Sequence, residues 1–228
     1  MIGNDVVDLH FADWPRYQHV GHPERVCTAE ELRSVREAES PSLTLSALWA
    51  SKEAAYKLFS RETRCPFVPR QFSVHLEDSV RLNGAEVAMV VHGGIPVRVE
   101  LSVTDDWLHS TAISPAIQSV CWRVREIDRG SRGGCQPLDE SKAARLLADE
   151  LASRYCEVDV LQDFQCRIPI FKYKNGGDAA IKVSLSHHGR FAAVAMGWPV
   201  SNRLGIVSGR SFTYRTSRWE EMCSTCTV

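Results

Sequence analysis

The longest amphipathic pattern of the chain lies in residues 42–60. At about 100° per residue, a helix over this range has one apolar stripe roughly 140° wide, which is typical of a core-facing surface. The stripe consists of Ala47, Leu48, Ser51, Ala54, Ala55, Leu58 and Phe59. The opposite arc carries Trp49, Lys52, Glu53, Tyr56 and Lys57. The pattern predicts a helix anchored in a core, with a carboxylate and an ammonium one turn apart on its polar face.

Strand patterns surround this helix in the first half of the chain. Residues 2–9 predict a short strand, and residues 28–39 predict a helix because Thr28 and Glu31 have the spacing of a capping box. Residues 61–70 contain arginines and prolines and predict a basic loop. Further strands are predicted at 71–76, 86–92, 97–103 and 110–113, with Asn83-Gly84 and Gly93-Gly94 at turns. These strands predict an antiparallel meander.

The second half repeats this plan. It has strand patterns at 119–127, 168–173, 181–185 and 191–196, a Gly-rich loop at 129–137 and an amphipathic helix at 138–155. Residues 99–107 and 183–191 are the most similar internal segments, although short β segments also resemble each other by chance. We expect an internal duplication with a ligand cleft between its halves. The expected division is a lobe of residues 1–115, a lobe of residues 116–200 and a tail or strap of residues 201–228.

Composition and charge place the chain among globular proteins. It has 228 residues, of which 44% are hydrophobic and 24% are charged, and these values exclude a mostly disordered chain. The net charge is −1, but residues 1–115 carry 11 Lys and Arg against 16 Asp and Glu, while the rest carries 16 against 12. The second half is therefore the better host for an anionic ligand. An uneven charge split is also common in soluble proteins.

Two further features bear on the compartment. The first residues lack the pattern of a secretory signal, and the most apolar later run, residues 191–200, is too short to span a bilayer. The eight cysteines are scattered, and only Cys223 and Cys226 have ligand spacing, which is weak evidence for zinc. We expect a cytoplasmic protein with thiols and without a membrane or nucleic-acid partner.

Three segments combine polar residues in an unusual way. They are Gly3-Asn4-Asp5, Trp49-x-x-Lys52-Glu53-x-x-x-Lys57 and Ser184-Leu185-Ser186-His187. Asp5 is an anomaly in a strand pattern because aspartate is depleted in strands. Glu53 and Lys57 alone would fit a solvated ion pair worth about 0.3–0.5 kcal/mol. With Asp5 before them and Ser186-His187 after them, they also fit a functional site.

These segments, in this order, resemble the 4'-phosphopantetheinyl transferase superfamily. Its patterns are Gly-x-Asp, (Phe/Trp)-x-x-Lys-Glu-x-x-x-Lys and Ser-x-Ser-His. The resemblance implies an α+β fold with two pseudo-symmetric lobes, each with a helix packed on a small antiparallel sheet. It also implies transfer of the phosphopantetheine group of coenzyme A to a serine of an apo acyl or peptidyl carrier protein. Adenosine 3',5'-bisphosphate would be released.

The resemblance also implies roles for individual residues. Asp5 and Glu53 would hold Mg²⁺, and Glu53 would be the base for the carrier serine, while Lys57 would neutralise or protonate the phosphates. Ser186 and His187 would bind phosphates of coenzyme A, and Lys52 is a less certain contact. Arg61 and Arg64 are candidates for the 3'-phosphate on charge alone.

The chain departs from the family patterns in two respects. Val7 stands where surfactin-type transferases carry a glutamate, so two protein ligands on the metal are expected, as in holo-acyl-carrier-protein synthases. The length is that of the two-lobed surfactin type, but there Ser-x-Ser-His lies in the first lobe, whereas here it follows the metal-binding segments. We expect a pseudo-dimeric monomer, and the trimer of the small synthases is the alternative.

Two other functions fit the same residues. One is a Mg²⁺-dependent phosphohydrolase that uses Asp5 and Glu53 with water as the nucleophile. The other is a non-catalytic module that binds a carrier protein or coenzyme A. The choice of carrier protein cannot be derived from the sequence.

Overall fold

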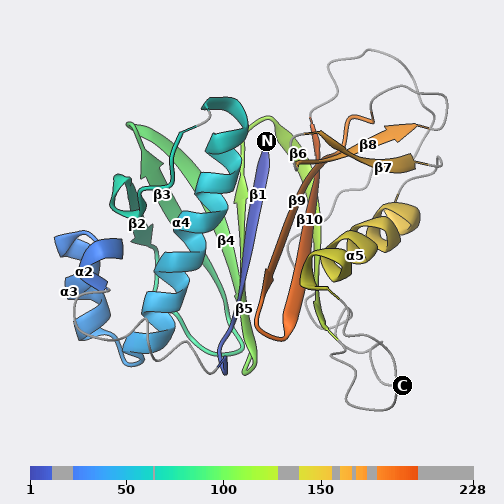
Figure 1. Cartoon of the computed structure of the whole chain (residues 1–228). Coiled ribbons are helices and arrows are strands. Elements are labelled where there is room, and N and C mark those ends of the chain that lie inside the picture. Colours follow the sequence, from blue (N-terminus) through green and yellow to red (C-terminus); the bar gives the residue numbers. More distant parts are fainter. Residues whose placement is uncertain are drawn as a thin grey trace, which may run out of the picture.

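The computed structural model describes residues 1–11, 23–63, 65–127, 139–155, 160–165, 168–173 and 179–199. These residues form antiparallel sheets with helices packed against them, so the α+β class is confirmed. Figure 1 shows α4 across one sheet and α5 across the other. The helices are α2 (Pro23–Val26), α3 (Ala29–Glu37), α4 (Pro41–Thr63) and α5 (Glu140–Tyr155), and Pro69–Gln71 forms a short 3₁₀ helix.

The first sheet contains five strands in the order β1-β5-β4-β3-β2. The strands are β1 (Ile2–Asp8), β2 (Phe72–Leu76), β3 (Ala85–His92), β4 (Ile95–Val103) and β5 (Trp107–Ile113). The predicted meander from β2 to β5 is confirmed, and β1 joins its far edge by pairing with β5. Asn83, Gly93 and Gly94 all have positive φ, which explains these residue types at the turns.

The second sheet has the order β6-β10-β9, and a separate pair of strands, β7 and β8, lies near α5. The strands are β6 (Ile117–Glu126), β7 (Val160–Gln165), β8 (Ile168–Tyr173), β9 (Lys182–His188) and β10 (Phe191–Pro199). β7 was not predicted, because Asp163 and two glutamines weaken its strand pattern. The pseudo-symmetry and the boundaries at 115 and 200 stay predictions, and the tail 201–228 lies outside the described residues.

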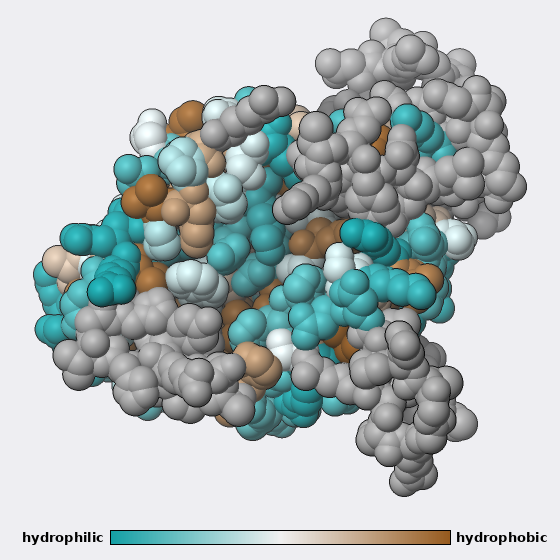
Figure 2. Space-filling model, in the orientation of Figure 1, coloured by the Kyte–Doolittle hydropathy of each residue, from teal (hydrophilic) through white to brown (hydrophobic). Residues whose placement is uncertain are grey.

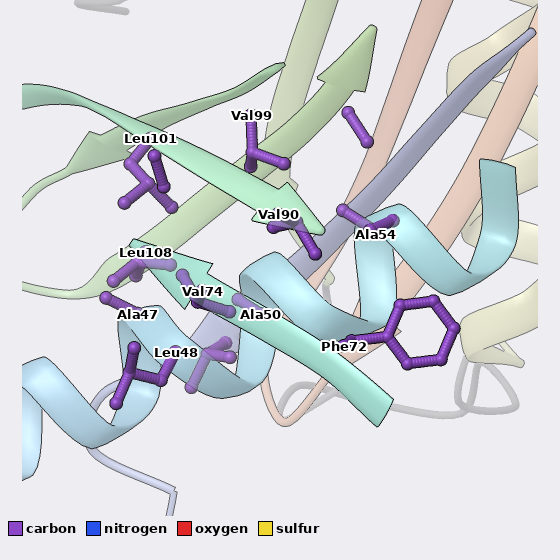
Figure 3. Close-up of a cluster of buried hydrophobic side chains, with 14 of the residues drawn as sticks. Ala47, Leu48, Ala50, Ala54, Phe72, Val74, Val90, Val99, Leu101 and Leu108 are labelled. Carbon is purple, nitrogen blue, oxygen red and sulfur yellow. The ribbon is translucent and has the colours of Figure 1, made fainter. Parts of the chain in front are cut away.

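Helix α4 packs its apolar stripe against the first sheet. Figure 3 shows Ala47, Leu48, Ala50 and Ala54 beside side chains of the strands, among them Val90, Val99, Leu101 and Leu108. All of these side chains are buried. The predicted core-facing arc is therefore confirmed. The helix is longer than the predicted 42–60, because Pro41 fits the first helical turn and the final turn continues to Thr63.

The prediction that Lys52 lies on the exposed polar face of α4 is wrong. Its side chain is fully buried, whereas the helical pattern placed it with Glu53 on the exposed arc. The Lys52 ammonium donates to both carboxylate oxygens of Glu31, each at 2.8 Å, and to the carbonyl oxygen of Phe72 at 2.6 Å. The pattern failed because α3 and the start of β2 cover this side of α4, which helical periodicity cannot show.

Gly3 allows β1 to lie directly on α4. A Cβ at this position would lie 2.0 Å from the carbonyl oxygen of Ala54 and 2.8 Å from the amide nitrogen of Leu58. Both neighbours are backbone atoms in the middle of a helix, so neither can move away cheaply. The glycine of the Gly3-Asn4-Asp5 segment is therefore required for the close approach that brings Asp5 to the face of α4.

We expect Gly3→Ala to destabilise the fold by about 3 kcal/mol or more, because the added methyl group forces β1 away from α4. Urea denaturation followed by circular dichroism measures this change. Gly94→Ala is the matched control: its Cβ meets nothing within 4 Å, and only its positive φ of 79° opposes a side chain. The control should cost about 1–2 kcal/mol. Equal losses in both variants would contradict the steric explanation.

Hydrophilic residues predominate among the described residues on the face that carries α4 and α5 (Figure 2). Figure 2 shows hydrophobic residues scattered among hydrophilic ones there. None of the described helices is long and apolar enough to cross a membrane.

Candidate active site

A pocket lies where β1, α4 and β9 meet. Its volume is about 400 Å³. β1 and β9 lie side by side between the two helices, so the pocket joins segments from both halves of the sequence (Figure 1). The residues that line it are Asp5, Val6, Val7, Trp49, Glu53, Lys57, Leu185, Ser186, His187 and His188. Residues of all three predicted motifs therefore converge in one place.

Asp5, Glu53 and Lys57 form the polar wall of this pocket. Asp5 is contributed by β1, while Glu53 and Lys57 project from α4 one helical turn apart. The Lys57 ammonium donates to the Asp5 carboxylate oxygen Oδ1 at 2.8 Å and to the carbonyl oxygen of Asn4 at 3.0 Å. The Asp5 side chain is only 11% exposed, so this ion pair is much better shielded from water than a surface pair.

Glu53 carries the most strongly shifted carboxyl group of this wall. Its pKa is raised from 4.5 to about 7, chiefly by burial and also by the neighbouring Asp5 carboxylate, while Lys57 acts in the opposite direction. A carboxyl group with a pKa near neutrality can both take up and release a proton at physiological pH. The shift also shows that Asp5 and Glu53 repel each other when both are charged.

The opposite wall comes from β9 and is tied to β1 through Asn4. The Asn4 backbone amide donates to Ser184 Oγ at 3.0 Å, and its side-chain amide nitrogen lies 3.1 Å from Ser186 Oγ and 3.2 Å from His109 Nε2. Burial lowers the pKa of His109 to about 3, so its ring is neutral and accepts this hydrogen bond. Ser186 is thus buried and held by Asn4, at the edge of the pocket.

His187 is the more exposed member of the Ser-x-Ser-His segment. Its side chain is 43% exposed, and its Nδ1 atom lies 3.0 Å from a carboxylate oxygen of Glu140 at the start of α5. Neighbouring strand residues point to opposite faces. Ser186 therefore packs against β1, while His187 faces Glu140.

Asp8 fixes the end of β1 to the turn after β9. It is fully buried, and Arg190 donates to its Oδ2 atom through Nε at 2.9 Å and to its Oδ1 atom through Nη2 at 3.0 Å. Gly189 lies against the same carboxylate, since a Cβ there would be 2.5 Å from Asp8 Oδ2. Hydrogen bonds with Arg190 lower the pKa of Asp8 against the effect of burial. Asp8 and Arg190 thus connect the two halves of the chain at a place next to the pocket, but neither of them lines the pocket.

Two described residues that were predicted to contact coenzyme A, Lys52 and Arg61, do not line the pocket. Lys52 points into the core, as described above. Arg61 lies further along α4, where burial lowers its pKa to about 10, and it is absent from the pocket wall. Arg64 lies outside the described residues. The geometry therefore gives Lys52 and Arg61 no contact with the space in which a ligand would sit.

Sequence reasoning missed the apolar part of the pocket and the role of Asn4. Val6, Val7, Trp49 and Leu185 line the cavity beside the charged groups. The sequence signal that Val6 and Val7 lie near the site was their position directly after Asp5. Strand alternation alone did not show which of these two side chains faces the cavity. Asn4 occupies the variable position of Gly-x-Asp, and only its tertiary contacts with β9 reveal its function.

The carboxylates of this site fit a magnesium ion. No cluster of three or more His, Cys, Asp or Glu suitable for a metal occurs among the residues that the structure describes. Asp5 and Glu53 line the same pocket, however, and an ammonium already lies against the Asp5 carboxylate. Two hard oxygen ligands in a pocket with room for water are a normal protein contribution to Mg²⁺ binding.

One comparison with known proteins identifies the first half of the chain. Residues 1–111 match the family model of the 4'-phosphopantetheinyl transferase superfamily. This part of the chain is similar to that superfamily. The match confirms the predicted family, and it supports phosphopantetheinyl transfer as the general class of reaction. A search of curated proteins found no match.

The superfamily match covers one wall of the pocket. It includes Asp5, Glu53 and Lys57, whereas Ser186 and His187 lie beyond its last residue. The charged wall therefore belongs to the recognised transferase segment. The β9 wall is connected to it by the hydrogen bonds of Asn4 with Ser184 and Ser186, and by the bond that the Asp8 backbone amide donates to His188 Nδ1 at 3.0 Å.

Proposed function

We propose that this protein transfers the 4'-phosphopantetheine group of coenzyme A to a serine of an apo carrier protein, with Mg²⁺ at Asp5 and Glu53. The observation that carries this proposal is the convergence of Asp5, Glu53 and Lys57 in one pocket within the range matched by the superfamily model. A pocket of about 400 Å³ between two sheets suits part of an extended ligand such as coenzyme A.

Glu53 is the proposed general base. In this role its carboxylate accepts the proton of the carrier serine, directly or through a water molecule, as the serine oxygen attacks the β-phosphorus. A new serine O–P bond forms, and the P–O bond to the adenosine 3',5'-bisphosphate leaving group breaks. Magnesium, when bound, would offset the negative charge that develops on the phosphoryl oxygens.

Lys57 and His187 are the proposed phosphate contacts. The ammonium of Lys57 lies in the pocket one turn from Glu53, where it can neutralise the pyrophosphate or protonate the leaving phosphate. His187 reaches the same pocket from β9 with a ring that is partly exposed. The second half, which carries the positive charge excess, would thus supply part of the binding surface for an anionic ligand.

The direct test is incubation of the purified protein with coenzyme A, Mg²⁺ and apo carrier proteins from fatty-acid, polyketide and peptide synthesis. Mass spectrometry should detect a phosphopantetheine adduct on the serine of at least one carrier. Asp5→Asn should slow the transfer about 100-fold or more, because it removes a charged metal ligand. Asp78→Asn, an exposed residue outside the pocket, is the matched control and should transfer at the parent rate.

The same assay separates the alternatives. Cleavage of the pyrophosphate bond without any carrier would identify a phosphohydrolase. A folded protein that binds coenzyme A or a carrier but gives neither adduct nor cleavage would be a non-catalytic module. Either result would reject the transferase proposal.

A further inference from the structure

Lys57 occupies the position where a cation would approach Asp5. Its ammonium contacts Asp5 Oδ1 at 2.8 Å and the Asn4 carbonyl oxygen at 3.0 Å, so it is held by two oxygen atoms of β1. The Lys57 side chain is 27% exposed and lines the pocket, whereas Asp5 is nearly buried. The positive charge of Lys57 thus already satisfies the carboxylate that the proposed function assigns to the metal.

A divalent cation bound at the Asp5 carboxylate would repel the ammonium that lies against it. Both are positive, and the low exposure of Asp5 means that little water screens their repulsion. The divalent ion has the stronger attraction for Asp5, and it gains a second ligand in Glu53. Lys57 has a flexible stem and an open pocket beside it, so its ammonium has a place to go.

We propose that Lys57 is a cation placeholder: it neutralises Asp5 in the metal-free protein, and a divalent metal displaces it from β1 into the pocket. This inference rests on the metal site of the proposed function. The displacement makes the ammonium available for an anionic ligand only after the metal is bound. The metal and the phosphate would therefore bind cooperatively. Metal binding breaks the Lys57–Asp5 ion pair, which otherwise keeps the ammonium from the phosphate, and the phosphate offsets the repulsion between the ammonium and the metal.

Chemical labelling of lysines tests this exchange without any transfer reaction. The full chain is treated briefly with an acetylating reagent, with and without Mg²⁺, and each labelled lysine is quantified by mass spectrometry. Mg²⁺ should increase the labelling rate of Lys57 about fivefold, the factor that corresponds to the loss of an ion pair of about 1 kcal/mol. Lys142, which is exposed, and Lys52, which is fully buried, are internal references and should not change.

A second measurement uses variants and the paramagnetic ion Mn²⁺. Lys57→Met should bind Mn²⁺ about fivefold more tightly than the parent protein, because no ammonium competes for Asp5. Arg61→Met removes an equal charge one turn further along α4, outside the pocket wall, and should change the affinity less than about twofold. This control separates displacement from a general effect of net charge.

Each outcome decides the proposal independently of the transferase function. Increased labelling of Lys57 and tighter Mn²⁺ binding by Lys57→Met support the exchange, even if no carrier protein is modified. Unchanged or decreased labelling with Mg²⁺ overturns it, even if transfer is observed. Equal or weaker Mn²⁺ binding by Lys57→Met overturns it as well.

Discussion

Glu53→Gln is expected to abolish transfer and, at the same time, to stabilise the metal-free protein above neutral pH. Glutamine keeps the size of the side chain but removes the base and one charged metal ligand. The transfer rate should fall about 100-fold or more, the usual contribution of a general base. The gain in stability follows from the pKa of Glu53 and has a definite pH dependence.

The sign of that dependence follows from proton binding. The folded protein binds the Glu53 proton up to a pKa of about 7, whereas an unfolded chain releases it near 4.5. Between these values the folded state holds more protons, so the stability contributed by Glu53 falls as the pH rises from 4.5 to 7. Above pH 7 the ionised carboxylate, which is half-buried and repelled by Asp5, destabilises the fold.

Glutamine does not titrate, so the variant should melt at a higher temperature than the parent at pH 8, by about 2–4 °C for each kcal/mol gained in a chain of this size. The difference should disappear at pH 4.5. Thermal unfolding without divalent metal measures both values. Glu77→Gln, at an exposed position outside the pocket, is the control and should change neither stability nor transfer. A stability gain that is equal at both pH values, or a parent-like transfer rate, would show that Glu53 does not have the proposed role.

Lys52→Met is expected to destabilise the protein by about 3–5 kcal/mol, because it leaves the Glu31 carboxylate buried without its cation. Glu31 is only 3% exposed. It accepts hydrogen bonds from Lys52, from the backbone amide of Val74 at 2.8 Å and from that of Thr28 at 2.7 Å. Lys52 also donates to the carbonyl oxygen of Pro69 at 3.2 Å. This one ion pair therefore connects α3, α4 and the start of β2.

Urea denaturation of three variants tests the assignment. Lys52→Met alone should show the full loss. The double variant Lys52→Met/Glu31→Gln should recover part of it, because no buried charge remains and the glutamine can still accept a backbone hydrogen bond. Arg98→Met breaks an exposed ion pair with Glu100 and should cost less than about 1 kcal/mol. A loss for Lys52→Met as small as that of Arg98→Met would contradict the buried-pair explanation.

The same ion pair explains why Lys52 and Glu53 have different functions although they are neighbours. Adjacent helical residues lie about 100° apart, so the two side chains leave α4 in different directions. Lys52 enters the space under α3 and β2, and burial lowers its pKa, an effect that Glu31 counteracts. Glu53 faces β1 and the pocket. Lys52 is thus assigned to holding α4 in place.

Local patterns predicted most of the elements of this protein. The capping box at Thr28 and Glu31 begins α3 as expected, and the apolar stripe of α4 packs in the core. The alternation of apolar and polar residues, together with the residues at the turns, predicted the meander of the first sheet. These features depend on interactions between residues close in the sequence, so periodicity and residue type are sufficient to predict them. β7 was missed because its residues lack that local signal.

The sequence by itself determined the candidate residues Asp5, Glu53, Lys57, Ser186 and His187 and the family to which they point. Only the tertiary structure decided how they are used. Glu53 and Lys52 both fall on the predicted polar arc of α4. The elements packed against the helix, however, leave Glu53 in the pocket wall and bury Lys52 in the core. The raised pKa of Glu53 and the contact of Lys57 with Asp5 likewise depend on segments about 50 residues apart in the sequence. These segments meet only in the folded chain, where burial and the neighbouring charges shift the pKa.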